Sequence, residues 1–255
     1  MRRRLIVGNW KMNGDRPALA ELDGVIAAAD AAPRVDVAIC PPFTLIAPAV
    51  ARCPRLWIGG QDCHAALSGP HTGAVSAGML VEAGARLVIV GHSERRQELG
   101  ETDADVCAKA EAALGQGLAT IVCIGETEAQ RNDGEQERAV ARQLRGSLPG
   151  DTAGELVVAY EPIWAIGSGR IPTAADIGAM HAMIRATLIE MIGPTRAEAV
   201  RILYGGSVTA ANAADLFAIP NVDGALVGGA SLTAEAFVPI VSAAAQNGAD
   251  AFLPG

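Results

Sequence analysis

The sequence predicts a single (β/α)8 barrel, and three observations lead to this fold class. Eight short, continuously apolar runs alternate with longer stretches that have the spacing of amphipathic helices. The chain has 255 residues, which matches one barrel of about 250 residues. Polar and glycine residues gather directly after most of the apolar runs, where barrels carry their active sites. We expect one domain over residues 1–255; a doubly wound open sheet is the alternative, because periodicity does not show closure.

Each apolar run is expected to form one strand of a parallel sheet. The runs are continuously apolar rather than alternating, as is typical of strands that are covered on both faces. They are Leu5–Gly8, Val35–Cys40, Leu56–Gly60, Leu87–Val90, Leu118–Ile124, Leu156–Tyr160, Arg201–Tyr204 and Gly224–Val227.

Alanine-rich amphipathic stretches between these runs predict the helices. Thr102 and Thr173 each begin a segment typical of a helix N-cap, and Gly115 and Gly193 stand where a C-cap glycine is expected. No linker, charge block or low-complexity segment divides the chain. The clearest helical stretches are Pro17–Ala32, Ala104–Leu114, Glu135–Leu144, Ala174–Met191 and Ala234–Ala245.

The amino-acid composition and the net charge limit which kinds of molecule the protein can bind. Half of the residues are hydrophobic and 19% are charged, which is enough apolar material for a large core. The net charge of −8 argues against a surface that binds nucleic acid or anionic lipid, so an anionic substrate needs a local positive site. Five cysteines without a CxxC pair fit a reducing compartment. The basic residues at 2–4 precede an apolar run that stops at Val7, and no run reaches the ~20 residues of a membrane span. We expect a cytoplasmic protein.

Lys11 is a candidate site residue because the chain has only two lysines against eighteen arginines, and the other, Lys109, lies in a predicted helix. A compact ammonium directly after the first strand offers a point charge with three donors. His92 is the one histidine that ends an apolar strand; a helix that starts behind it disfavours its charged form, which suits a neutral electrophile or acid. An ordinary surface lysine and a structural histidine remain the alternatives.

Glu161 follows the sixth strand and precedes Pro162. A carboxylate at the end of a buried strand is costly unless it is paired or used, and desolvation there raises its pKa toward the range of a general base. A structural carboxylate that caps backbone or pairs with arginine is the alternative.

Glycine-bearing segments follow the last three strands, at Ile166–Gly169, Gly205–Ser207 and Gly228–Ala230. Exposed backbone N–H groups, together with a helix N-terminus after the eighth strand, can hold a phosphate without arginine. Each segment alone is weak, because tight turns also need glycine, but their placement on neighbouring strands favours a phosphate site.

Missing motifs favour chemistry without a cofactor. The chain has no GxxxxGK[ST], HExxH, GxSxG or dinucleotide fingerprint, and its histidines are scattered. We expect no metal and no cofactor, and a proton transfer on a small phosphorylated substrate.

Six segments, in order and each at a predicted strand end, resemble the triosephosphate isomerase family along essentially the whole chain. They are GNWKMN at 8–13, GHSERR at 91–96, VCIGE at 122–126, AYEPIWAIG at 159–167, YGGSV at 204–208 and LVGGA at 226–230.

The resemblance implies interconversion of glyceraldehyde 3-phosphate and dihydroxyacetone phosphate, in glycolysis and gluconeogenesis, through an enediolate. It implies that Glu161 removes the carbon-bound proton and that His92 polarises the carbonyl and moves protons between the two oxygens. Lys11 and Asn9 would bind substrate and stabilise the enediolate, and Glu94 would support them.

The same resemblance assigns the phosphate to Gly167, Ser207, Gly228 and Gly229. It also implies that residues 162–172 form a lid that excludes water from an intermediate prone to lose phosphate.

The resemblance further implies a homodimer, in which the long loop Cys63–Val75 inserts into the partner. Three positions depart from the family pattern: Ala74 stands where an acid is usual, Asp62 where Asn is frequent, and Arg170-Ile171-Pro172 replaces Lys-x-Ala at the second lid hinge. These departures bear on subunit affinity and lid kinetics rather than on proton transfer.

Two other hypotheses remain open. Another phosphate-binding barrel, such as an aldolase or a sugar-phosphate epimerase, would need a Schiff-base lysine or clustered metal ligands. A non-catalytic barrel would be favoured by loss of Glu161, His92 or Lys11, and all three are present.

Overall fold

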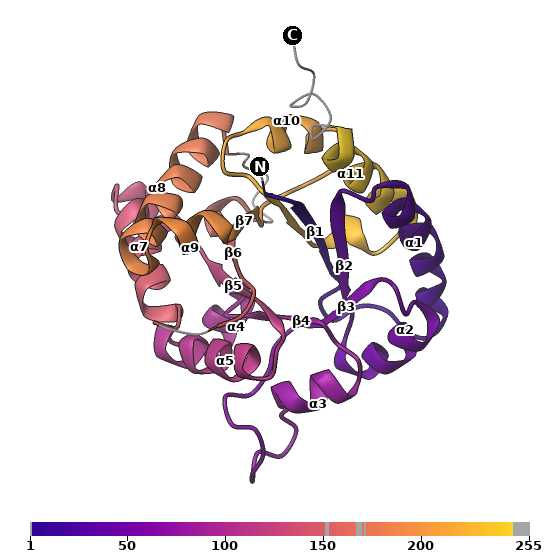
Figure 1. Cartoon of the computed structure of the whole chain (residues 1–255). Helices are drawn as coiled ribbons and strands as arrows, with labels where there is room; N and C mark the ends of the chain where they lie inside the picture. Colours follow the sequence, from indigo (N-terminus) through magenta and orange to yellow (C-terminus); the bar gives the residue numbers. More distant parts are fainter. Residues whose placement is uncertain (1, 151–152, 167–169, 171, 247–255) are drawn as a thin grey trace.

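The chain forms a closed barrel of eight parallel strands, in sequence order, surrounded by helices (Figure 1). The computed structural model describes residues 2–150, 153–166, 170 and 172–246. The strands are β1 (Arg4–Asn9), β2 (Val35–Cys40), β3 (Trp57–Gly60), β4 (Leu87–Val90), β5 (Ala119–Ile124), β6 (Leu156–Tyr160), β7 (Arg201–Tyr204) and β8 (Gly224–Val227). All eight predicted strands are confirmed, with ends that differ by at most one residue.

The last strand pairs with the first and closes the barrel. Leu5 through Gly8 of β1 lie in parallel register with Gly224 through Val227 of β8, and the N–H of Leu5 donates to the carbonyl of Asp223 at 3.0 Å. The alternative of an open, doubly wound sheet is therefore wrong. Because the carboxyl ends of all strands meet at one mouth, residues after β1, β4, β6, β7 and β8 are brought together there.

Two apolar layers explain why the strands are continuously apolar. Along β1, Leu5 and Val7 point into the barrel, whereas Ile6 packs outward against the helices. All three side chains are buried, so neither face of the strand tolerates the polar residues that an exposed face would carry. The remaining strands repeat the alternation of inward and outward side chains, with polar residues only at Asp36 of β2, Thr120 of β5 and Arg201 of β7.

Long helices cover the outside of the barrel, and shorter helices and turns connect them to the strands (Figure 1). None of the helices in the described ranges is long and apolar enough to cross a membrane. The α-helices are α1 (Glu21–Ala31), α2 (Ile46–Arg52), α3 (Ala77–Glu82), α4 (Ser93–Glu98), α5 (Asp103–Gly115), α6 (Glu128–Asn132), α7 (Gln136–Ser147), α8 (Ala174–Ile192), α9 (Pro194–Ala199), α10 (Ala213–Ala218) and α11 (Ala234–Gln246). Single turns of 3₁₀ helix occur at Pro17–Ala20, Phe43–Leu45, Ile163–Ala165 and Gly229–Ser231.

Helix punctuation matches the sequence predictions at three of four positions. Thr102 and Thr173 each cap a helix, and each forms a reciprocal capping box with the aspartate three residues later. Gly193 ends α8 with a φ of +76°, as a glycine at this position should. The expectation for Gly115 was wrong: it lies inside the last turn of α5, and Gly117, with a φ of +80°, makes the reversal instead.

Candidate active site

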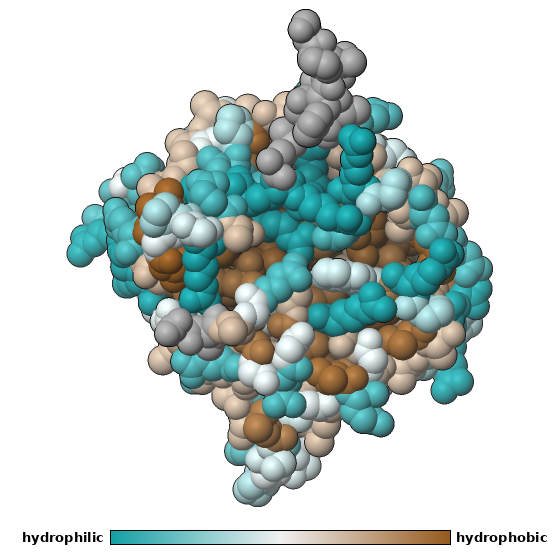
Figure 2. All heavy atoms as spheres, in the orientation of Figure 1, coloured by the Kyte–Doolittle hydropathy of each residue, from teal (hydrophilic) through white to brown (hydrophobic). Residues whose placement is uncertain are grey.

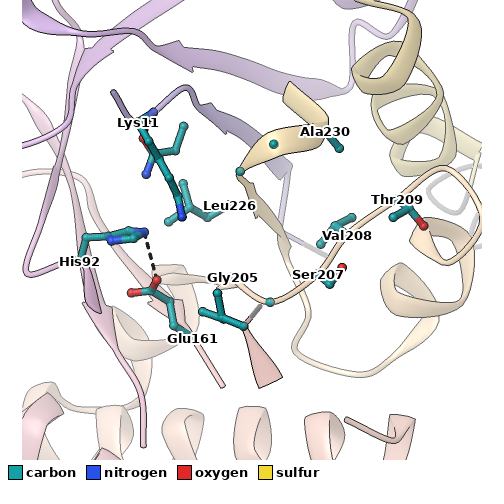
Figure 3. A pocket seen from close by; sticks show the side chains of 14 residues that line it. Lys11, His92, Glu161, Gly205, Ser207, Val208, Thr209, Leu226 and Ala230 are labelled. Atoms are coloured by element: carbon teal, nitrogen blue, oxygen red, sulfur yellow. Dashed lines mark hydrogen bonds and ion pairs between the residues drawn. The ribbon is translucent and has the colours of Figure 1, made fainter. Parts of the chain in front are cut away.

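A cavity of about 310 Å³ opens at the carboxyl ends of the strands (Figure 3). Of the nine site residues predicted from the sequence, seven line it. Glu94 lies in an adjoining cavity, and Gly167 is outside the described residues. The seven are Asn9, Lys11, His92, Glu161, Ser207, Gly228 and Gly229.

Glu161 follows β6 and is 2% exposed. Its backbone N–H continues the sheet by donating to the carbonyl of Ile124 at 2.8 Å. Its carboxylate accepts hydrogen bonds from the backbone N–H of Ser93 at 3.1 Å and from the Ser93 hydroxyl at 3.0 Å, and Nε2 of His92 lies 3.1 Å from Oε1. A buried carboxylate is therefore held in place by donors at the start of α4, which follows β4.

His92 occupies the N-cap position of α4. Its Nδ1 accepts the backbone N–H of Glu94 at 3.2 Å, so this nitrogen carries no proton and the proton of a neutral ring resides on Nε2. Nε2 faces Glu161 and the cavity, where Figure 3 marks the contact. The helix start behind His92 was expected from the sequence; the structure adds the bond that fixes the tautomer.

Lys11 is positioned by an unusual backbone conformation. Its φ is +53°, which a residue with a side chain rarely adopts. The side chain of Asn9 accepts the N–H of Lys11 at 3.0 Å, and Gln61 donates to the carbonyl of Lys11 at 2.8 Å, so both peptide groups are held. The ammonium then reaches over the cavity toward His92 and Glu161 (Figure 3). Strain that surrounding bonds maintain is common at functional sites.

Glu94, on α4, fixes the charged end of Lys11. Its Oε1 lies 2.5 Å from the Nζ atom, and its other oxygen is 3.8 Å from Nδ1 of His92. Burial opposes ionisation of Glu94, but the hydrogen bond and the positive charge of Lys11 hold its pKa below the usual value. The pair holds the end of the Lys11 side chain in place beside the cavity.

The opposite wall of the cavity combines glycine backbone with the side chains of Ser207, Val208 and Leu226 (Figure 3). Gly205 and Gly206 follow β7, while Gly228 and Gly229 follow β8 and lead into the 3₁₀ turn Gly229–Ser231. A Cβ on Gly228 would lie 3.6 Å from Cε of Lys11, so this wall and the ammonium border the same space. A 3₁₀ turn replaces the α-helix N-terminus expected directly after the eighth strand.

Three residues of the site's support had no role in the sequence predictions. Ser93 binds Glu161 and Gln61 binds Lys11, as described above. The third is Glu126 after β5, which is fully buried and accepts from Tyr160 at 3.1 Å and from Trp164 at 2.7 Å. The sequence could have indicated a role for Ser93 and Glu126, because both lie within the motifs that follow strands. No sequence feature indicated a role for Gln61.

No cluster of three or more metal-ligating side chains occurs in the described part of the chain.

Comparisons with known proteins agree with this architecture. The family model described as triosephosphate isomerase matches residues 4–244. A triosephosphate isomerase from Ruegeria pomeroyi is 57% identical over 249 residues, covering 96% of this chain and 99% of that protein. One from Dinoroseobacter shibae is 56% identical, covering 95% and 99%.

A solved structure gives the same result. The crystal structure of triosephosphate isomerase from Bartonella henselae superimposes with a TM-score of 0.87 at 42% identity, and the match covers 94% of this chain and 98% of that one. With the closed barrel, the paired Glu161 and His92 at its mouth, and relatives of this identity over nearly the full length, the chain belongs to the triosephosphate isomerase family.

Proposed function

We propose that this chain interconverts D-glyceraldehyde 3-phosphate and dihydroxyacetone phosphate by proton transfer through an enediolate, as the names of its relatives imply. One observation carries the proposal: a carboxylate, an imidazole whose Nε2 faces it and an ammonium border one cavity whose opposite wall is rich in glycine backbone. This is the set of groups that an aldose–ketose isomerisation of a phosphorylated substrate needs.

Glu161 is the proposed base. Before substrate binds, its carboxylate is occupied by donors from Ser93 and His92. A substrate between Glu161 and His92 replaces these contacts, so that the carboxylate meets the carbon-bound proton and Nε2–H of His92 meets an oxygen. The proton taken from one carbon is returned to its neighbour, and Glu161 ends the cycle ionised.

His92 and Lys11 act on the oxygens in this proposal. The Nε2–H of His92 donates to the carbonyl as negative charge develops and passes a proton between the two oxygens. The ammonium of Lys11, with Asn9 beside it, stabilises the enediolate, and Glu94 holds the Lys11 side chain in position. Fixed donors at developing charge typically contribute about 3–4 kcal/mol each.

The phosphate is assigned to backbone N–H groups near Gly228 and Gly229, to Ser207, and to Gly167 in the lid. Because the net charge of the chain is −8, the attraction for phosphate must come from groups at the site itself. Lys11 supplies the positive charge there, beside neutral backbone donors. Binding energy from this end of the substrate can support closure of a lid over the reacting carbons.

An aldolase is disfavoured by the state of the two lysines. A Schiff base requires a neutral amine, but Lys11 is paired with Glu94 at 2.5 Å, and Lys109 is paired with Asp62 and Glu101 at 2.9 and 2.5 Å. The isomerase proposal uses the ammonium of Lys11 and gives Lys109 no part in the reaction.

Glu161→Gln tests the proposal. The amide keeps the size of the side chain but cannot accept the proton, so kcat should fall by at least ~10²-fold. The assay couples disappearance of glyceraldehyde 3-phosphate to a reporter enzyme, without added metal. Retained binding of inorganic phosphate controls for an intact cavity. Near-normal turnover by a preparation free of contaminating enzyme would refute the assignment.

We also propose that the chain is a homodimer. The loop between β3 and α3 projects from the barrel, and Figure 1 shows it extending beyond α3. A second cavity of about 200 Å³ adjoins the active site and is bordered by exposed Met12 (96%), Phe43 and Leu99 (63%), an apolar surface that a partner would cover. Figure 2 shows apolar and polar surface mixed on the projecting loop itself.

The absence of an acid at Ala74 does not leave an unpaired cation at this surface. Arg95, which borders the second cavity, is already bonded within the chain to Asp62 at 2.8 Å and to Glu101 at 2.7 Å. The dimer therefore does not depend on an inter-subunit ion pair at this position. Sedimentation at micromolar concentration should give a dimer; a fully active monomer would contradict the proposal.

We further propose that residues 1–255 form one domain and that the protein is cytoplasmic. Strands from both halves of the sequence close one barrel, which supports the first. All five cysteines are unpaired, which supports a reducing compartment.

A further inference from the structure

The side chain of Gln143, on α7, binds both polar groups of Gly125. Its Oε1 accepts the N–H of Gly125 at 2.8 Å, and its Nε2 donates to the carbonyl of Gly125 at 2.9 Å. Gly125 is the first residue after β5, and the Gln143 amide binds it as a residue of an antiparallel strand would, through one donor and one acceptor.

Gly125 is also in direct contact with the backbone of Glu161. The sheet pairing of β5 with β6 ends at Ile124 opposite Tyr160, and the N–H of Glu161 then donates to the carbonyl of Ile124 at 2.8 Å. A Cβ built on Gly125 would lie 1.8 Å from the carbonyl oxygen of Glu161. No side chain fits there, so the peptide of Glu161 rests against the backbone of Gly125.

The other side of Glu161 is confined in a similar way. The N–H of Gly205 donates to the carbonyl of Tyr160 at 2.7 Å, and a Cβ on Gly205 would lie 2.9 Å from Cγ of Glu161. Glu161 is therefore enclosed between Gly125 and Gly205. Gly205 directly follows β7 and is bonded to Tyr160 of β6, whereas the N–H and the carbonyl of Gly125 are both bonded to Gln143.

We propose that Gln143 is a positioning residue for the base: it fixes the peptide of Gly125 and, through it, the backbone from which the Glu161 carboxylate extends. This inference rests on the proposed isomerase function. Gln143 does not line the cavity and would not contact the substrate. It affects only the position of the Glu161 backbone, and through it the position of the carboxylate. A displacement of about 1 Å at a catalytic group can cost ~10²-fold in rate, so a loss of at least about fivefold in kcat is expected when Gly125 is released.

Gln143→Met tests the role of the two hydrogen bonds. Methionine has a similar length and can cover the same apolar neighbours, but it neither donates nor accepts at Gly125. We expect kcat to fall at least fivefold while KM for the triose phosphate stays within about twofold, because the phosphate groups on β7 and β8 are untouched. Gln116→Met is the matched control, since Gln116 is an exposed glutamine at the end of α5 and should leave kcat unchanged.

Gln143→Glu provides a readout that a purely structural role would not move. As a carboxylate it accepts the N–H of Gly125 but presents a second oxygen to the carbonyl, where a donor is required. As a carboxylic acid it restores both bonds, because a protonated carboxyl donates and accepts like the amide. The kcat of this variant relative to wild type, measured at each pH, should therefore rise as pH falls from 8 to 5.5.

A double variant shows whether Gln143 acts through Glu161. If it positions the base, adding Gln143→Met to Glu161→Gln should lower the residual kcat by less than twofold. Unchanged kcat in Gln143→Met, a pH-independent ratio for Gln143→Glu, or a full additional loss in the double variant would each overturn the inference. If wild-type protein lacks isomerase activity, the proposed function fails instead.

Discussion

His181 allows a quantitative prediction of how stability depends on pH. The side chain is fully buried on α8, and its Nδ1–H donates to the carbonyl of Asn221 at 2.9 Å, while Nε2 has no partner in the described part of the protein. Burial, with a contribution from the neighbouring Arg185, lowers the pKa of His181 to about 4. The folded protein therefore holds this histidine neutral well below the pH at which a free imidazole is protonated.

The direction follows from comparing the folded and unfolded states. An unfolded histidine, with a pKa of about 6.5, binds its proton before the folded one does. The stability associated with neutral His181 is thus fully present above about pH 6.5 and is lost as pH falls toward 4. At about 1.36 kcal/mol per pH unit, the free energy of unfolding should fall by about 2 kcal/mol between pH 7 and pH 5 from this group alone.

Urea unfolding of wild type, His181→Asn and His181→Gln, at one protein concentration and several pH values, measures the effect. The Asn amide can keep the donor to Asn221, and neither variant titrates. Both variants should be less stable than wild type at pH 7, but their loss between pH 7 and pH 5 should be about 2 kcal/mol smaller. Parallel curves for all three proteins would refute the reasoning.

Two further predictions concern charged pairs. Glu94→Gln removes the anion 2.5 Å from Nζ of Lys11. Because hydrogen bonds to charged groups contribute about 1.5–3 kcal/mol, kcat/KM should fall about tenfold or more. Steady-state kinetics at pH 7.5 measure this, and an unchanged kcat/KM would contradict the role of Glu94. Burial raises the pKa of Asp62 although Lys109 and Arg95 are bonded to it, so its charge is disfavoured by folding. Asp62→Asn should therefore keep or raise the Tm at pH 8, and a fall of more than about 5 °C, roughly 1–2 kcal/mol for a chain of this size, would show that the ion pairs dominate.

The strands and most of the site residues were predictable for a common reason. In a closed barrel each strand is buried on both faces, so its sequence carries an unbroken apolar run, and the chemistry begins where that run stops. Lys11, His92 and Glu161 are each recognisable as polar residues directly after such a run. Closure itself was not predictable, because the pairing of β1 with β8 joins residues about 220 positions apart in the sequence and leaves no periodic signal.

Short helices and supporting contacts were harder to predict. Helices of five to seven residues, such as α6, complete fewer than two turns and give no periodicity of 3.6. Gln143 lies in a helix that the sequence predicted, yet nothing in that helix indicates that its amide binds Gly125, 18 residues earlier. The glycine that ends α5 was predicted at Gly115, but the reversal is made by Gly117, two residues later.

The seam between β1 and β8 makes the active site a product of the two ends of the chain. Asn9 and Lys11 leave β1, and Gly228 and Gly229 leave β8, so they become neighbours only when the last strand has paired with the first. A chain in which β8 has not yet paired can bury apolar surface and form most of its sheet. It does not yet have the phosphate site of Gly228 and Gly229 beside the ammonium of Lys11. Catalytic activity therefore requires the pairing of β8 with β1. During refolding, activity should return together with this last pairing rather than with the appearance of secondary structure.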